Sequence, residues 1–483
     1  MNKLKLFVEN FFIYGFGGII SKLIPLLMIP IVTRIMPDTK YYGISDLSNT
    51  VIQFGSALAL MGMYDAMYRM FFEKDEVEYK KNVCSTALLF TLFSSFVVFV
   101  VMLALRNTIA QYFFSDSKYT FVVYLSATAT LVTATNSVFS APTRMQNHRK
   151  TYIIANTVSP LISFGLAIPM LLAGHYIIAL PLATVISGVT VELVFWFLNK
   201  SWFSLKLFDK ELLKQLLILA VPLLPNFLIY WIFNSCDKVM ITNLIGIGAA
   251  GIYSVGSKLG HASQLIYTAF AGGWQFFAFS TMKDENQVET NSRIYEYLGV
   301  ISFVATALVC CLSFPLFKVL FPEEYLEGYI VAPYLFMAPL LQMLYQTGNN
   351  QFLVIKKSWP GMFILSSGAI VNVILNWFLI PIIGIEGAAI ATLVGYAVTD
   401  IVDIIVLMKC KLMAPRVRFL WVVLLMASYM LVWRLLFSKN TVIGISIWLG
   451  FVFLCIFIYK DDLKRLCRII QDSKKLSCAG SGV

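Results

Sequence analysis

The stretch that decides the fold is residues 234–270, which read NSCDKVMITNLIGIGAAGIYSVGSKLGHASQLIYTAF. From Gly251 onward it is apolar and typical of a membrane-spanning helix, yet Lys258 lies about two turns inside it. A lysine near the centre of a bilayer costs roughly 2.5 to 3.5 kcal/mol, so such residues usually face a polar cavity or a partner. Polar side chains recur here at steps of three or four residues, on one face of the predicted helix: Ser254, Lys258, His261, Gln264 and Thr268. We therefore expect this face to line something wet or charged.

The composition places the whole chain in the membrane class. Of its 483 residues 59% are apolar and 13% are charged, and the mean hydropathy is +0.78. Soluble domains are about 45 to 50% apolar and about 25% charged. Windows of about twenty apolar residues mark fourteen candidate helices joined by short connections, which predicts an all-α polytopic membrane protein of about 14 transmembrane helices. They cover approximately residues 9–35, 43–64, 84–105, 119–141, 152–172, 177–198, 214–233, 251–280, 295–320, 330–355, 359–381, 387–408, 418–437 and 441–459.

The net charge of +11 has a topological explanation. When the loops are assigned to alternate sides, most of the 37 Lys and Arg residues fall on the side that carries both termini. Because basic loops stay in the cytoplasm, we expect both termini there, in a multi-pass membrane protein. The apolar start of the chain lacks a small-x-small cleavage site, so it is predicted to be a retained first span. This distribution accounts for the basicity without a nucleic-acid partner.

A repeat becomes visible when the chain is compared with itself at an offset of 208 residues. The agreements are Gly43-Ile44 with Gly251-Ile252, Phe113 with Phe321, Arg149 with Lys357, and Ala183-Thr184 with Ala391-Thr392. Six predicted helices separate the copies, so both begin on the same side and form parallel repeats about an axis along the membrane normal. We expect two pseudo-symmetric six-helix lobes, residues 1–208 and 209–411, followed by helices 13 and 14 in residues 412–460 and a cytoplasmic tail, 461–483. Two lobes imply a central cleft, where transporter substrates bind.

Polar residues within the predicted spans are candidates to line that cleft. Pro25 and Pro30 are expected to bend the first span, which carries Lys22 and, near its outer end, Arg34. An alternative is that the amides join neighbouring helices and that the lysines extend to an interface. His261 alone is more typical of a packed core histidine. The candidate substrate-binding residues are Lys22, Arg34, Asn49, Gln53, Asn226, Tyr230, Lys258, His261, Gln342, Tyr345 and Asn349.

Carboxylates are nearly absent from the middle of the predicted spans. Glu192, Asp400 and Asp403 lie near inner span ends, and Asp237 is assigned to an outer loop. A cleft lined by cations and amides without a buried acid is suited to an anion that also carries many hydroxyls. Three histidines and eight scattered cysteines without a CxxC pair predict neither a metal site nor a disulfide framework, and we expect no cofactor.

Three segments resemble a known family: residues 237–259, the outer loop 320–325 (LFPEEY), and residues 380–392 (IPIIGIEGAAIAT). They are similar to the polysaccharide repeat-unit flippases (O-antigen or capsule type, Wzx-like) of the multidrug/oligosaccharidyl-lipid/polysaccharide exporter superfamily. The resemblance extends through the predicted twelfth span. It implies two six-helix lobes, alternating access and export of an undecaprenyl-pyrophosphate-linked oligosaccharide, with membrane lipids and a polysaccharide polymerase and chain-length proteins as partners.

The resemblance also implies a role for two lysines. Basic residues of spans 1 and 8 line the cavity in lipid flippases of this superfamily, and Lys22 and Lys258 occupy comparable places. Arginine is more usual at the first position, and a lysine reads phosphate geometry less strictly because it is a point charge. We expect transport without covalent chemistry, so the protein is not expected to be an enzyme.

Three alternatives stay open. A cation-coupled multidrug antiporter of the same superfamily would need a membrane-embedded carboxylate, and the predicted spans 1 and 7 contain none. A peptidoglycan lipid-precursor flippase agrees with fourteen spans. Such flippases usually carry a run of arginines in the first two spans, whereas Arg34 and Arg69 here both lie at span ends. A membrane glycosyltransferase or polymerase would be expected to carry a large outer loop with catalytic groups, and the outer loops are short.

Overall fold

The computed structural model describes residues 23–281, 285–355, 357, 359–462 and 464. This part of the chain is helical and contains no strand, which confirms the predicted all-α class. Eleven of its helices are long and apolar enough to cross a membrane. Of the other three predicted spans, the first is described only as the helix Leu23–Ile35, the second is less apolar, and the eighth is divided into shorter pieces. The count of fourteen therefore stays a prediction.

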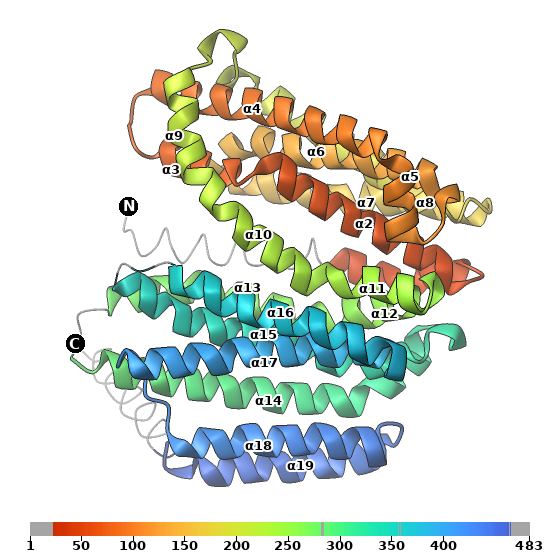
Figure 1. The fold of residues 1–483 in the computed structure, drawn as a ribbon, viewed down its shortest axis with the longest axis vertical. Coiled ribbons are helices and arrows are strands. Elements are labelled where there is room, and N and C mark those ends of the chain that lie inside the picture. The colour runs from red at the N-terminus through yellow and green to blue at the C-terminus, as the bar shows by residue number, and fades with distance from the viewer. Residues whose placement is uncertain (1–22, 282–284, 356, 358, 463, 465–483) are drawn as a thin grey trace, which may run out of the picture.

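Figure 1 shows the helices in two groups. The N-terminal bundle consists of α2 (Thr39–Leu60), α3 (Met63–Phe71), α4 (Val77–Ala104), α5 (Arg106–Phe114), α6 (Thr120–Met145), α7 (Arg149–Leu172), α8 (Ala179–Asn199) and α9 (Lys210–Ala220). The C-terminal bundle consists of α13 (Gln264–Ser280), α14 (Gln287–Leu320), α15 (Gly328–Val354), α16 (Trp359–Ile383) and α17 (Ile385–Lys409), with α18 (Val417–Val432) and α19 (Thr441–Ile458) packed on its far side. Between the groups run α10 (Leu224–Trp231), α11 (Asp237–Leu244) and α12 (Ile247–Gly260).

The predicted domain boundary at residue 208 falls before α9, and α9 packs on the N-terminal bundle. Leu212, Leu216 and Ala220 join a buried cluster with residues of α3 and α4, such as Met67 and Cys84. In the structure, α9 is therefore the last helix of the N-terminal bundle. The domain limits themselves stay predictions.

The seventh and eighth spans differ from their predicted ranges. A five-residue π-helical turn, Ile232–Cys236, joins α10 to α11, so one apolar stretch continues from Lys210 to Leu244. The prediction stopped at residue 233 because the polar run that follows lowers the hydropathy. In the eighth span, a 3-10 turn at His261–Ser263 separates α12 from α13. The eighth span is therefore not the single continuous helix that was predicted.

The two bundles meet where α2 crosses α12, at a pair of glycines. A Cβ on Gly43 would lie 2.5 Å from the carbonyl oxygen of Ile247, and a Cβ on Gly251 would lie 2.1 Å from that of Thr39. Only glycine allows backbones this close. Thr39 and Ile247 are 208 residues apart in the sequence, and so are Gly43 and Gly251. The residues that meet at the crossing are therefore equivalent positions of the internal repeat. The predicted pseudo-symmetry is therefore realised in a contact between the two copies.

Candidate functional site

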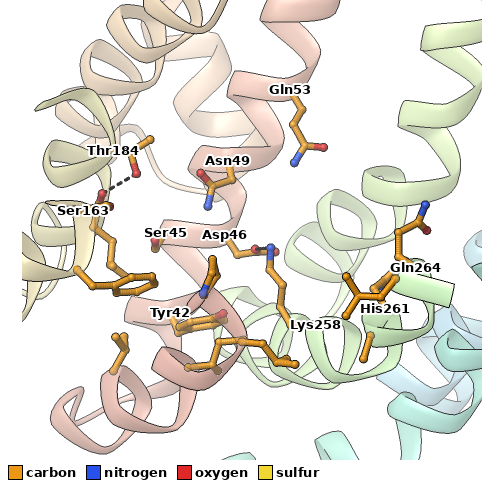
Figure 2. Close-up of a pocket in the computed structure, with 18 residues that line it drawn as sticks. Tyr42, Ser45, Asp46, Asn49, Gln53, Ser163, Thr184, Lys258, His261 and Gln264 are labelled. Atoms are coloured by element: carbon orange, nitrogen blue, oxygen red, sulfur yellow. Dashed lines mark hydrogen bonds and ion pairs between the residues drawn. The ribbon is translucent and has the colours of Figure 1, made fainter. Parts of the chain in front are cut away.

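A cavity of about 680 Å³ lies between the bundles. The N-terminal bundle and the first helix provide one wall, and α12, the turn after it and the start of α13 provide the other (Figure 2). Its polar lining residues are Tyr42, Ser45, Asp46, Asn49, Gln53, Ser163, Thr184, Lys258, His261 and Gln264. This central cavity is the candidate binding site.

The regularly spaced polar residues that the sequence showed on α2 and α12 contribute to this lining. Asn49 and Gln53 lie one turn apart on α2, and Lys258 extends from α12 across the cavity (Figure 2). The Lys258 side chain lines the cavity and is 40% exposed, although its ammonium also pairs with Asp46. Thr268 lies beyond the break at the 3-10 turn, and its hydroxyl donates to the carbonyl oxygen of Gln264 at 2.7 Å. The predicted five-residue polar face thus ends at Gln264.

His261 is held by its own helix. Its Nδ1 lies 2.7 Å from the carbonyl oxygen of Ser257, to which it donates, and the ring lines the cavity one turn from Lys258. The interaction with the backbone fixes the orientation of the ring. Lys258 is therefore the accessible cation of this wall, and His261 supplies a second nitrogen beside it.

Asp46 on α2 is the main residue that the sequence reasoning missed. Its side chain is 2% exposed, and its carboxylate lies 3.1 Å from the Lys258 ammonium and 2.7 Å from that of Lys238. The expectation of a cleft without a buried acid is therefore wrong. Asp46 lies seven residues into α2, near a span end, where a lone carboxylate is normally solvated. Its partners belong to the other repeat and are distant in sequence.

Asp237 and Lys238 are likewise not outer-loop residues. They begin α11 and are 3% and 7% exposed. Asp237 accepts hydrogen bonds from the Tyr253 hydroxyl and from the backbone N–H of Lys238, the latter at 2.8 Å. These charges are tolerated inside the protein because each has a partner, which hydropathy alone does not show.

The other predicted site residues lie elsewhere. Lys22 lies outside the described residues. Arg34 donates to the carbonyl oxygen of Val319 at 2.9 Å, which ties the first helix to α14. The Tyr345 hydroxyl donates to the carbonyl oxygen of Gly361 at 2.9 Å, so it joins α15 to α16. The remaining candidates also do not line the central cavity: Asn226, Tyr230, Gln342 and Asn349.

Three of these four residues have identifiable neighbours. The Asn349 side chain packs against Gly361, where a Cβ would lie 2.0 Å from its Oδ1. Tyr230 and Gln342 interact with each other between α10 and α15. These contacts agree with the alternative stated from the sequence, in which amides join neighbouring helices.

Two further carboxylates lie inside the C-terminal bundle. Asp400 and Asp403 on α17 are 7% and 1% exposed, and none of their carboxylate oxygens accepts a hydrogen bond from the described residues. Asp403 faces Gly348 on α15, where a Cβ would lie 2.0 Å from its Oδ2. Neither residue lines the central cavity.

Comparisons with known proteins identify a family and a similar fold. A family model described as "Polysaccharide biosynthesis protein" matches residues 31–330. No curated protein sequence matches the chain significantly. Among solved structures, the chain is similar to the lipid II flippase MurJ in an inward closed conformation, with a TM-score of 0.66 at 14% identity over 95% of this chain and 99% of the other. It is also similar to an inward-facing multidrug resistance MATE family transporter of the MOP superfamily, with a TM-score of 0.59 at 13% identity over 85% of this chain and 98% of the other. A point mutant of the Vibrio cholerae MATE transporter VcmN is similar with a TM-score of 0.60, at 12% identity over 85% of this chain and 98% of the other.

Proposed function

Because the chain belongs to the family of polysaccharide biosynthesis proteins, we propose that it is a flippase for lipid-linked oligosaccharides. In this proposal it moves undecaprenyl-pyrophosphate-linked repeat units, of the O-antigen or capsule type, from the inner to the outer leaflet of a bacterial cytoplasmic membrane. The step forms and breaks no covalent bond. The fold similarity to MurJ and to MATE transporters supports a transporter architecture. The substrate is the one that the resemblance to repeat-unit flippases implies, and the chemistry of the site supports it.

The observation that carries the proposal is the Lys258 ammonium in a cavity lined by amides and hydroxyls. A cation 40% exposed in an interbundle cavity can meet a phosphate, while Asn49 and Gln53 offer donors and acceptors to sugar hydroxyls. The prenyl chain would stay in the lipid.

Asp46 gives this site a resting state. Without substrate, the Lys258 ammonium is neutralised by Asp46, which also binds Lys238. An arriving diphosphate would replace Asp46 as the partner of the Lys258 ammonium, and Asp46 would remain paired with Lys238. No buried charge is then left alone at any stage, which is the costly outcome for groups inside a protein.

Transport further requires the bundles to separate at the crossing of α2 and α12. If both termini are cytoplasmic, as the distribution of basic loops indicates, the head group moves outward, away from a negative interior. Each net negative charge carried outward then gains about 2.3 kcal/mol per 100 mV of membrane potential. A polysaccharide polymerase and chain-length proteins would use the exported unit.

The test is transport of a fluorescent undecaprenyl-diphosphate-linked saccharide across proteoliposomes. We expect Lys258→Gln to abolish most transport, Lys258→Arg to retain part of it, and Lys439→Gln, a change in the loop before α19, to leave it unchanged. Full transport by Lys258→Gln at equal protein level would contradict the proposed role of the cavity cation. An unchanged saccharide length distinguishes transport from synthesis.

A second candidate function is a cation-coupled multidrug antiporter. It is favoured by the buried Asp46 and Asp237, since the sequence-based argument against it assumed that no such carboxylate exists. Ethidium efflux driven by an imposed proton or sodium gradient, and absent without the gradient, would support this function. A peptidoglycan-precursor flippase shares the fold, and lipid II in the same proteoliposome assay tests it directly.

A further inference from the structure

A second cavity, of about 370 Å³, lies within the N-terminal bundle. It is bounded by the end of α2, by α3, α6 and α7, and by Phe227 of α10. Its lining residues combine aromatic rings with amides, hydroxyls and one charge of each sign: Tyr64, Asp65, Asn136, Ser137, Ser140, Arg144, Tyr152, Asn156 and Phe227.

The second cavity continues the central cavity along two helices. On α2, Asn49 and Gln53 line the central cavity, and Ala57 and Leu60 line the second at the same spacing of three to four residues. On α7, Ser163 faces the first cavity and Asn156, seven residues earlier, faces the second. Steps of three, four and seven residues keep to one helix face. The two cavities therefore follow one path along α2 and α7.

The charges of the second cavity differ from those of the first. The Arg144 guanidinium donates to the Tyr64 hydroxyl at 3.0 Å and lies 5.9 Å from the centroid of the Tyr152 ring. Asp65 is close enough to interact electrostatically with Arg144. The lining of the second cavity thus carries one acid for one cation, whereas in the central cavity the carboxylate of Asp46 is shared by the two ammonium groups of Lys258 and Lys238. The second cavity is thus suited to a ligand without concentrated negative charge.

The remaining groups match a polyhydroxylated ring. The Oδ1 of Asn136 is buried and has no hydrogen-bond partner among the described residues, so it is available to a ligand hydroxyl. Phe227 also lines the cavity, and an aromatic ring can stack on the apolar side of a sugar ring. Leu60 follows Asp46 by fourteen positions on α2, about 21 Å along the helix axis, which leaves room for several linked sugars.

We propose that this second cavity is a saccharide subsite, which holds the glycan while the diphosphate lies at Lys258. The inference rests on the proposed function and deepens it, since it assigns the two chemical parts of one substrate to two cavities. Asn136 and the other amides would bind sugar hydroxyls, and the aromatic residues would stack on sugar rings.

The experiment measures binding of two lipids to the purified full-length protein by native mass spectrometry. One is undecaprenyl diphosphate, and the other is the pool of undecaprenyl-diphosphate-linked saccharides extracted from the source strain depleted of this protein. Asn136→Ala and Phe227→Ala test the subsite, Lys258→Gln tests the diphosphate position, and Phe197→Ala on the exposed face of α8 is the matched control.

We expect Asn136→Ala and Phe227→Ala to weaken binding of the saccharide lipid about tenfold, equivalent to about 1.4 kcal/mol, and to change undecaprenyl diphosphate binding less than about twofold. The unchanged binding of the sugar-free lipid also shows that the variants are folded. Lys258→Gln should weaken both lipids, and Phe197→Ala neither. Equal weakening of both lipids by the subsite variants, or of neither, overturns the subsite alone. If the unmodified protein binds neither lipid, the proposed function fails, and the subsite fails with it.

Discussion

The carboxylate of Asp46 lies 2.7 Å from the ammonium of Lys238, and the two side chains are only 2% and 9% exposed. Asp46 belongs to the N-terminal bundle and Lys238 to α11, so this ion pair ties the two halves of the repeat together. Tyr253 and Asp237 form a hydrogen bond beside it on the C-terminal side. Closure of the bundles on this side of the cavity therefore depends on buried charges that compensate one another.

Asp46→Asn is expected to destabilise the protein strongly. The variant leaves the Lys238 ammonium buried without its carboxylate, and breaking a buried pair in this way costs about 3 to 5 kcal/mol. The measurement is the unfolding temperature of purified protein in detergent. Asp46→Asn combined with Lys238→Met should recover part of the loss, because it removes the stranded charge.

The control for this prediction is Asp38→Asn. Asp38 forms a surface pair with Lys40 at 2.9 Å, with both side chains about two-fifths exposed. Such pairs contribute about 0 to 1 kcal/mol, and asparagine also caps helices well, so little change is expected. Equal losses in both variants would show that Asp46 is not a special interbundle contact.

Asp403→Asn is expected to leave the unfolding temperature at pH 7 unchanged or to raise it. Asp403 is 1% exposed, and its oxygens accept no hydrogen bond within the described part of the chain, so the substitution breaks no described pair. It removes the cost of burying an ionisable carboxylate. A loss of several degrees in the same thermal assay would mean that the carboxylate binds a stabilising cation.

Helix positions were predictable because each is encoded locally. Hydropathy windows identify the apolar helices, and the 208-residue repeat anticipates two bundles. That these bundles meet at Gly43 and Gly251 is seen only in the structure. The spacing of polar residues also predicted Asn49, Gln53 and Lys258 on one cavity, where the structure places them. A helical period of 3.6 residues decides which side chains share a face, and this depends only on nearby sequence.

The charged partners were not predictable in the same way. Asp46 looks like a solvated residue near a span end unless Lys238 and Lys258 are known to lie opposite, and those contacts arise only when the two bundles pack. The predicted seventh span likewise ended before Asp237, because hydropathy does not show that this carboxylate has partners inside the protein. The three amide and aromatic candidates of α15 have the expected spacing, but the face they share packs on neighbouring helices.

Glu296→Gln is expected to loosen α18 and α19 from the C-terminal bundle. Glu296 is fully buried and accepts from the Arg416 backbone N–H at 2.7 Å, the Arg418 Nε at 3.0 Å and the Tyr459 hydroxyl at 3.3 Å. Hydrogen bonds to charged groups contribute about 1.5 to 3 kcal/mol each, so the unfolding temperature should fall by several degrees. Amide hydrogen exchange should rise in α18 first.

Its control is Glu289→Gln, which removes an exposed pair on the same helix. Glu289 is 56% exposed, pairs with Arg293 four residues later, and also lies 3.6 Å from the exposed guanidinium of Arg416, just before α18. A pair of this kind contributes at most about 1 kcal/mol. If both variants behave alike, Glu296 does not anchor the last two helices.

Gly251→Ala is expected to force α2 and α12 apart. Its Cβ would lie 2.1 Å from the carbonyl oxygen of Thr39, a backbone atom that cannot move without its helix. The state in which the bundles are closed at this crossing should therefore lose population to one in which they are separated there. Spin labels at Asp116 and Glu324, one on each bundle, should report a longer distance by electron paramagnetic resonance. Gly165→Ala on α7 meets no atom within 4 Å, so it should leave that distance unchanged and add about 0.5 to 1 kcal/mol of stability. An unchanged label distance in Gly251→Ala would show that the glycine crossing does not control closure.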